Sequence, residues 1–279
     1  MISFPENPEA LAPVPPAPAP TAIPAGPLSE IASAPLHDPV WNGWDLLKLA
    51  SITIAALALS LIGALLAARR WAYPHADIAE LARNAVVVVL GQGIGYVIVF
   101  LYMYVLVTRE RRSSSFWNAI QWNWPSNPGT YLMWGVALSV ALQLLAHLLP
   151  IPKNLPIDSF FRTPAEAWML SLFGMTLAPL MEELLFRAFL YPVLKRSLGL
   201  AAAVLLTAGG FALLHGSQLK FAWGPLLVIF LVGLTLTIVR ARKNSVAASL
   251  LMHVAYNGTI SVLLFTATDG FRHLEKLNQ

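Results

Sequence analysis

Long apolar stretches, separated by short polar or basic segments, begin near residue 44 and continue almost to the C-terminus. A helix needs roughly 20 apolar residues to cross a hydrocarbon core of ~30 Å. The pattern predicts membrane spans at 46–68, 84–108, 131–149, 167–194, 198–219, 223–239 and 246–266. Transmembrane strands would alternate over about ten residues, whereas these runs are longer and unbroken. The sequence therefore predicts an all-α, polytopic transmembrane helix bundle of about seven spans.

Residues 1–43 form a different kind of segment, rich in proline and alanine. Such a composition cannot build a packed core, so we expect a disordered, polyproline-like tail. The segment lacks the basic region followed by an apolar region that defines a signal peptide. We divide the chain into this tail, the N-terminal transmembrane helices at 44–150 and a C-terminal membrane core at 151–279.

The composition supports an integral membrane protein. Hydrophobic residues make up 57% and charged residues only 11%, against about 25% charged residues in soluble domains. Cysteine is absent, which excludes disulfides and thiolate metal sites. The net charge of +4 arises from Lys and Arg at the ends of apolar segments. That distribution is typical of membrane flanks, so we expect a lipid bilayer as partner and no nucleic acid.

Three ionisable residues lie inside the apolar segment 170–194, in the run E-E-L-L-F-R. Each costs at least ~2.5–3.5 kcal/mol at the centre of a membrane helix. Glu183 and Arg187 are four residues apart and share a helix face, so they are expected to form an ion pair. Glu182 points about 100° away from Glu183. We therefore assign Glu183 to structure and Glu182 to chemistry.

Two later apolar segments also carry polar side chains at a spacing of four residues. Phe211 precedes His215, and His253 precedes Asn257. Because a His or Asn facing lipid would be costly, we expect these faces to converge with Glu182 on one cavity. Glu182, aided by His215, could activate water while His253 and Asn257 bind an oxyanion. Equally, the carboxylate and two imidazoles could ligate Zn²⁺.

The segment G-Q-G-I-G at 91–95 has the spacing of a small-residue helix contact. Without a preceding strand it does not indicate a phosphate loop. We interpret it as a site where two membrane helices approach closely.

Together, E-E-x-x-x-R at 182–187, F-x-x-x-H at 211–215 and H-x-x-x-N at 253–257 resemble the motifs of the CPBP intramembrane proteases. That family includes type II CAAX prenyl endopeptidases and the bacterial Abi, or bacteriocin-processing and immunity, proteins. The resemblance covers residues 165–267 and implies a multi-helix bundle with a conical cavity. It makes 151–279 a catalytic membrane core, in which the site residues are Glu182, Glu183, Arg187, His215, His253 and Asn257.

The resemblance also implies an intramembrane endopeptidase, either metal-dependent or glutamate-dependent, with Zn²⁺ as the candidate cofactor. Its substrate would be a peptide or a protein, prenylated or not, embedded in or attached to the membrane. The expected location is the bacterial inner membrane.

Two other functions fit some of the same residues. A non-catalytic immunity or scaffold protein would bind a peptide or membrane partner, but it would not need all three motifs intact. A proton-coupled transporter could use buried Glu and His as a relay. Transporters are commonly built from inverted repeats, and this chain shows none.

Overall fold

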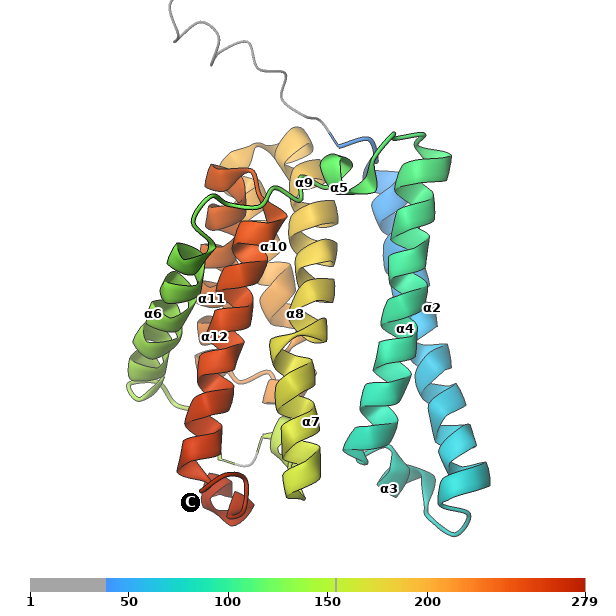
Figure 1. Cartoon of the computed structure of the whole chain (residues 1–279), viewed down its shortest axis with the longest axis vertical. Helices are drawn as coiled ribbons and strands as arrows, with labels where there is room; N and C mark the ends of the chain where they lie inside the picture. Colours follow the sequence, from blue (N-terminus) through green and yellow to red (C-terminus); the bar gives the residue numbers. More distant parts are fainter. Residues whose placement is uncertain (1–38, 154, 279) are drawn as a thin grey trace, which may run out of the picture. The chain divides into compact units, whose positions relative to one another are not determined.

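The computed structural model describes residues 39–153 and 155–278, and nearly all of the predicted Pro/Ala-rich tail lies outside this range. Within the described residues the chain is helical and contains no strand. The all-α prediction is therefore confirmed. Residues 38–279 form one compact unit, shown in Figure 1.

The helices follow one another in the order that the hydrophobic pattern predicts. The long elements are α2 (Gly43–Ala67), α4 (Ala85–Val105), α6 (Pro128–Ala146), α7 (Pro164–Met175), α8 (Leu177–Glu182), α9 (Tyr191–Leu198), α10 (Leu200–Leu214), α11 (Trp223–Lys243) and α12 (Val246–Ala267). The short α-helices are α3 (Ile78–Leu81) and α5 (Phe116–Ala119). The π-helical segments are η1 (Ala68–Ala72), η2 (Leu106–Glu110) and η4 (Glu183–Leu190), and the 3₁₀ segments are η3 (Pro156–Phe160), η5 (Ser217–Leu219) and η6 (Leu274–Asn278).

Six helical stretches of the described chain are long and apolar enough to cross a membrane. They are Gly43–Ala72, Ala85–Glu110, Pro128–Ala146, Pro164–Leu198, Trp223–Lys243 and Val246–Ala267. The remaining predicted span, 198–219, is the shorter helix α10, which has 15 residues. At 1.5 Å per residue α10 covers only about 22 Å, less than the ~30 Å hydrocarbon core. It therefore ends within the depth of the bundle.

Local sequence signals explain where several helices begin. Asn42 caps α2, and Asp45 Oδ2 accepts a hydrogen bond from the backbone N–H of Asn42. Thr163 and Glu166 form the same reciprocal arrangement at the start of α7. Ser245 caps α12 by accepting a hydrogen bond from the third residue of that helix. These side chains satisfy amide groups that the first turn of a helix leaves unpaired.

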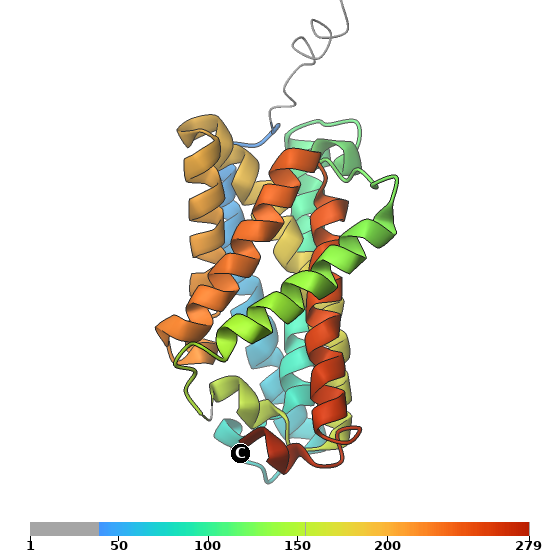
Figure 2. The same cartoon turned by 90° about the vertical axis from the view of Figure 1, so that its left-hand side faces the viewer.

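The helices pair in a simple pattern. Helix α2 packs along α4, α10 packs against α11 and α9, and α6 packs against α12. Figure 2 shows α6 crossing obliquely over α11 and α12. Helix α12 also contacts α7, α8 and η4, which are three successive parts of the fourth membrane-spanning stretch, Pro164–Leu198. It is the element best placed to carry residues of a shared site.

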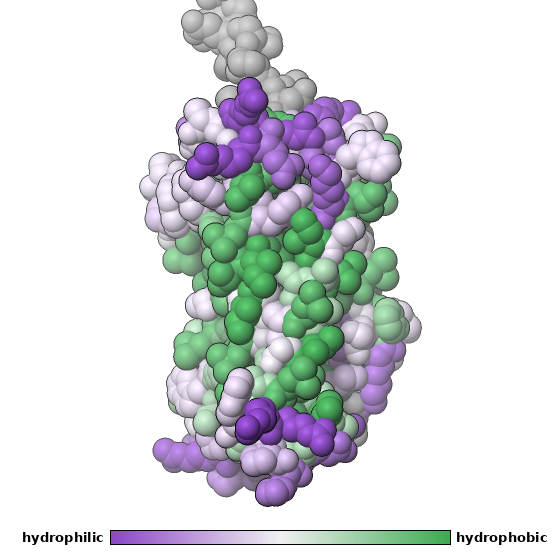
Figure 3. Space-filling model, turned by 90° about the vertical axis from the view of Figure 1, so that its right-hand side faces the viewer, coloured by the Kyte–Doolittle hydropathy of each residue, from purple (hydrophilic) through white to green (hydrophobic). Residues whose placement is uncertain are grey.

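The surface agrees with a membrane environment. Figure 3 shows an apolar band between two hydrophilic ends on one face of the molecule. Many large apolar side chains are exposed along the long helices, including Ile54, Leu59, Leu90, Val97 and Leu101. Exposed apolar side chains over this much of a helical surface are stable only in lipid. The chain is an integral, multi-pass membrane protein.

Glycines allow two of the closest helix contacts. A Cβ atom at Gly91 would lie 3.0 Å from the Leu61 backbone, and one at Gly95 would lie 2.8 Å from side-chain atoms of Leu57 and Ser60. The predicted packing role of G-Q-G-I-G is therefore confirmed, with α2 as the partner helix. Gly135 of α6 makes a still tighter contact than Gly91 or Gly95, because a Cβ there would meet the Met252 carbonyl oxygen of α12.

The helical unit begins before residue 44. Trp41 is buried, stacks on Phe189 and donates a hydrogen bond from Nε1 to the Phe189 carbonyl at 3.0 Å. Arg196 donates hydrogen bonds to the carbonyl oxygens of Pro39 and Trp41. The last residues of the segment 1–43 are thus part of the folded unit. The side chain of Trp41 packs inside the protein.

We expect Gly135→Ala to destabilise the protein by about 1–3 kcal/mol, because its new methyl group would push against backbone that cannot move aside cheaply. Thermal unfolding in detergent measures this change. Gly93→Ala is the matched control, since a Cβ at Gly93 meets nothing within 4 Å. Equal melting temperatures for the two variants would contradict the close α6–α12 contact.

Candidate active site

The fourth span is interrupted just before the two glutamates. Helix α7 ends at Met175, and Thr176, at φ −122° and ψ −79°, separates it from α8. Pro179 has no N–H group and could not donate to the Met175 carbonyl of a continuous helix. Carbonyl groups at the end of α7 are consequently free of helical partners. One of them, on Gly174, accepts a 2.7 Å hydrogen bond from Asn257 Nδ2.

The span continues as the π-helix η4, which carries Glu183 and Arg187. A π-helical hydrogen bond to the Arg187 carbonyl would come from residue 192, which is a proline and has no N–H. Arg240 of α11 supplies the missing donor through Nε at 3.2 Å. Arg240 is itself buried and also donates to the side chains of Gln121 and Asn244.

Glu183 lies at the centre of a buried cluster. Its Oε1 atom accepts hydrogen bonds from Arg187 Nη1 at 3.0 Å and from His253 Nδ1 at 2.9 Å. The side chains of Glu183 and Arg187 are completely buried. Arg187 Nη2 also donates to the carbonyl of Gly233 at 3.0 Å. The predicted ion pair is present, and it includes His253, which the sequence did not lead us to expect.

His215 is positioned by the end of the short helix α10. It caps this helix, and its Nδ1 atom lies 2.8 Å from the carbonyl oxygen of Phe211, one turn earlier. A carbonyl oxygen can only accept, so Nδ1 of His215 carries the hydrogen. The same reasoning gives Nδ1 of His253 a hydrogen, because its partner Glu183 is a carboxylate. While such a ring carries a single hydrogen, its Nε2 atom is a hydrogen-bond acceptor.

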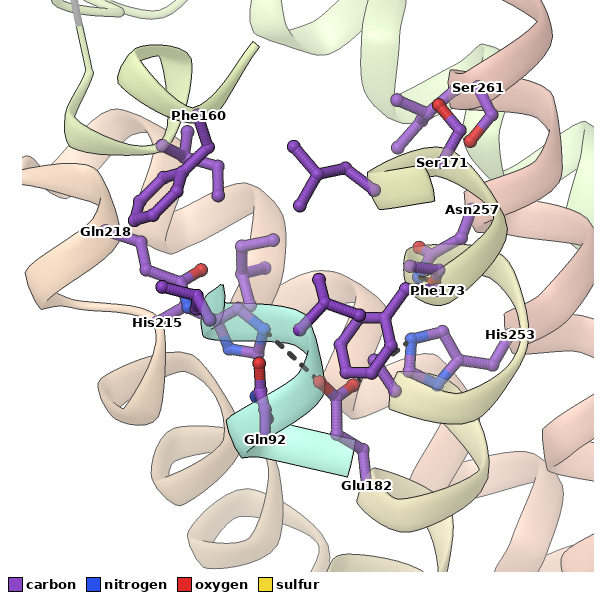
Figure 4. A pocket seen from close by; sticks show the side chains of 18 of the residues that line it. Gln92, Phe160, Ser171, Phe173, Glu182, His215, Gln218, His253, Asn257 and Ser261 are labelled. Atoms are coloured by element: carbon purple, nitrogen blue, oxygen red, sulfur yellow. Dashed lines mark hydrogen bonds and ion pairs between the residues drawn. The ribbon is translucent and has the colours of Figure 1, made fainter. Parts of the chain in front are cut away.

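Both Nε2 atoms face Glu182. The distances are 3.8 Å from His215 Nε2 to Oε1 and 3.6 Å from His253 Nε2 to Oε2. Unlike Glu183, Glu182 is accessible, with 21% of its side chain exposed. Figure 4 shows Glu182 between the two imidazole rings, with Asn257 next to His253. The structure therefore brings the predicted polar faces together, and it buries Glu183 while leaving Glu182 accessible.

These residues line a cavity of about 550 Å³. Most of its remaining lining is apolar and comes from α4, α7, η3, α11 and α12, for example Val88, Phe160, Phe173 and Ile260. Sequence reasoning missed the contributions of α4 and η3. In α4 the glycines were a clear packing signal, but the polar residue beside them, Gln92, carried no motif. In η3 the aromatic residues gave no signal of a cavity wall.

Zn²⁺ is the cofactor that the residue types allow. Glu182 and the two Nε2 atoms have the donor chemistry of a zinc site. Within 39–153 and 155–278, however, no group of three or more His, Asp or Glu side chains is arranged to hold a metal ion. Glu182, His215 and His253 are the residues that would hold such an ion, and activation of water by Glu182 does not itself require one.

We expect Arg187→Ala to lower the free energy of unfolding by about 3–5 kcal/mol, because it leaves the buried Glu183 carboxylate uncompensated. The yield of monodisperse protein and its thermal unfolding measure this loss. Arg242→Ala, on an exposed position of α11, is the control. A well-expressed Arg187→Ala protein with the melting temperature of the control would argue against the buried pair.

The C-terminal part of the chain matches one known family. Residues 164–259 match the family described as Type II CAAX prenyl endopeptidase Rce1-like. The matched range contains all the predicted site residues, from Glu182 to Asn257. Neither a search of curated proteins nor a search of solved structures finds a match. The matched part of the chain, which carries all three motifs, is similar to the CPBP family of intramembrane proteases.

Proposed function

We propose that the protein is an intramembrane endopeptidase in which Glu182 activates a water molecule. One observation carries this proposal: an accessible carboxylate faces two imidazole Nε2 atoms at 3.6 and 3.8 Å inside a largely apolar cavity. The family match supports the same class of activity.

The geometry around Glu182 suits a bound nucleophilic water. The two separations are too long for direct hydrogen bonds, and a gap of this size is commonly bridged by water. Glu182 and a neutral imidazole are both acceptors at this point, so a bridging water would donate both of its hydrogens. Its lone pairs would then face the cavity, which is the orientation that attack on a carbonyl carbon requires.

In the proposed reaction the water oxygen forms a bond to the scissile carbonyl carbon, and one water proton passes to Glu182 with assistance from His215. The carbonyl oxygen takes up the electron pair and becomes an oxyanion. When the C–N bond breaks, the leaving nitrogen receives the proton from Glu182. General acid–base catalysis of this kind contributes typically 10²–10⁴-fold.

Asn257 and His253 remain our candidates for binding the oxyanion. Asn257 donates one amide hydrogen to Gly174, which fixes the side chain and leaves the second hydrogen available. His253 uses its Nδ1 hydrogen on Glu183. It can therefore donate from Nε2 only while it carries a second proton. Asn257 is thus the better prepared donor, and His253 depends on proton transfer.

The cavity also limits the substrate. Its apolar walls favour a membrane-embedded peptide or a lipid-modified chain end over a soluble peptide. Cleavage beside a prenylated cysteine is one case of this chemistry, and a location in the bacterial inner membrane is part of the same proposal.

We expect Glu182→Gln to fold and bind peptide but to lose turnover by about 10²–10⁴-fold or more, because the amide cannot accept the water proton. The probes are quenched fluorescent peptides ending in a CAAX sequence, with and without an S-farnesyl group, added to protein in liposomes. Glu80→Gln, at an exposed position on α3, is the matched control and should retain full activity.

The same assay separates the peptidase from a non-catalytic immunity or scaffold protein. A scaffold protein would bind the probes without cleaving them, and Glu182→Gln would leave that binding unchanged. Cleavage by Glu182→Gln at the wild-type rate would refute the mechanism.

We expect chelators such as EDTA and 1,10-phenanthroline to leave the activity unchanged, because a water molecule activated by Glu182 as general base needs no metal ion. Turnover before and after dialysis against chelator measures this. Loss of activity that added Zn²⁺ restores would instead identify Glu182, His215 and His253 as metal ligands.

A further inference from the structure

Helix α4 presents two different faces through four neighbouring residues. Gly91 and Gly95 pack against α2. Gln92 and Tyr96, one position further along, are turned by about 100° and line the cavity that contains Glu182. Figure 4 shows Gln92 extending from α4 into this cavity near Glu182 and His215. The glycine contact thus fixes the rotation of α4 that brings the two polar side chains to the site.

The Tyr96 hydroxyl is held in a defined position. Gln92 Nε2 lies 2.9 Å from the Tyr96 hydroxyl oxygen, and an amide nitrogen can only donate,. The phenol oxygen is therefore the acceptor, and its own hydrogen remains free. No acceptor for that hydrogen lies among the residues the structure describes. The ring is buried and stacked on Phe173 of α7, with centroids 5.9 Å apart and planes at 6°.

The proposed reaction needs a further hydrogen-bond donor to the oxyanion. Stabilising an oxyanion usually takes two or more preorganised donors, and Asn257 offers one free amide hydrogen. His253 has committed its Nδ1 hydrogen to Glu183. Tyr96 and Glu182 line the same cavity. A neutral phenol can donate without first being protonated, which His253 cannot do from Nε2.

We propose that Tyr96 is a further catalytic residue, whose hydroxyl donates a hydrogen bond to the scissile carbonyl oxygen as it becomes the oxyanion. Gln92 is its positioning residue, because the amide occupies a phenol lone pair and turns the hydroxyl hydrogen toward the cavity. Tyr96 and Asn257 then approach the carbonyl oxygen from α4 and α12, on two sides of the cavity. This inference rests on the proposed peptidase function.

The direct test is Tyr96→Phe, which removes the hydroxyl and keeps the ring that stacks on Phe173. We expect kcat to fall by about 10²–10³-fold, the usual effect of losing one oxyanion donor, with KM and melting temperature nearly unchanged. Tyr102→Phe makes the same change on the same helix, outside the cavity lining, and should behave as wild type. A kcat for Tyr96→Phe within threefold of the control would overturn the proposal.

Gln92→Met tests the positioning role, since it keeps the length of the side chain and removes the donor. We expect a smaller fall in kcat than for Tyr96→Phe, and no additional fall when the two changes are combined. Such non-additivity is the signature of two residues that act through one hydrogen bond. Independent, multiplicative losses would show that Gln92 does not act through Tyr96.

The assay with farnesylated and unmodified CAAX peptides distinguishes failure of the peptidase proposal from failure of the Tyr96 proposal. A wild-type protein that cleaves none of them, or a Glu182→Gln variant that still cleaves, contradicts the peptidase and with it the role of Tyr96. Cleavage that depends on Glu182 but not on the Tyr96 hydroxyl leaves the peptidase standing and removes Tyr96 from its mechanism.

Discussion

The site depends on a single buried oxygen atom, Oε1 of Glu183. It accepts hydrogen bonds from Arg187 and His253, so one carboxylate joins η4 to α12. Arg187 extends the connection to α11 through the Gly233 carbonyl. A buried carboxylate without donors would be strongly destabilising. The free energy of folding therefore selects the helix arrangement that turns His253 Nε2 toward Glu182.

The other site residues depend on irregular helix geometry. In a membrane the backbone groups released by a helix break must find partners inside the protein. The carbonyl released after α7 holds Asn257, and the one at the end of α10 holds His215. The carbonyl opposite Pro192 holds Arg240. Each break thus provides an acceptor that fixes the orientation of one side chain and, for His215, the position of its ring hydrogen.

These details also explain what the sequence could predict. The spacing of four residues between Glu183 and Arg187 predicts their pairing. The pair forms although η4 is π-helical. The cost of lipid exposure predicts that His215 and His253 turn inward. The predicted span at 198–219 did not place the end of α10 correctly, although the polar run H-G-S-Q at 215–218 directly follows its last residue. Nor did any local pattern indicate the His253–Glu183 contact, which joins residues 70 positions apart.

The first half of the chain contributes residues to the cavity that the family motifs do not indicate. The family match begins at residue 164, yet the cavity is closed on one side by α4, which lies before it. Gln92 and Tyr96 reach that wall only because Gly91 and Gly95 let α2 approach the opposite face. The packing of two helices with no motif of the family thus determines which polar groups face Glu182. A fragment limited to the matched residues would keep the glutamates and histidines but lose one wall of the cavity, and with it the exclusion of water from the polar groups inside.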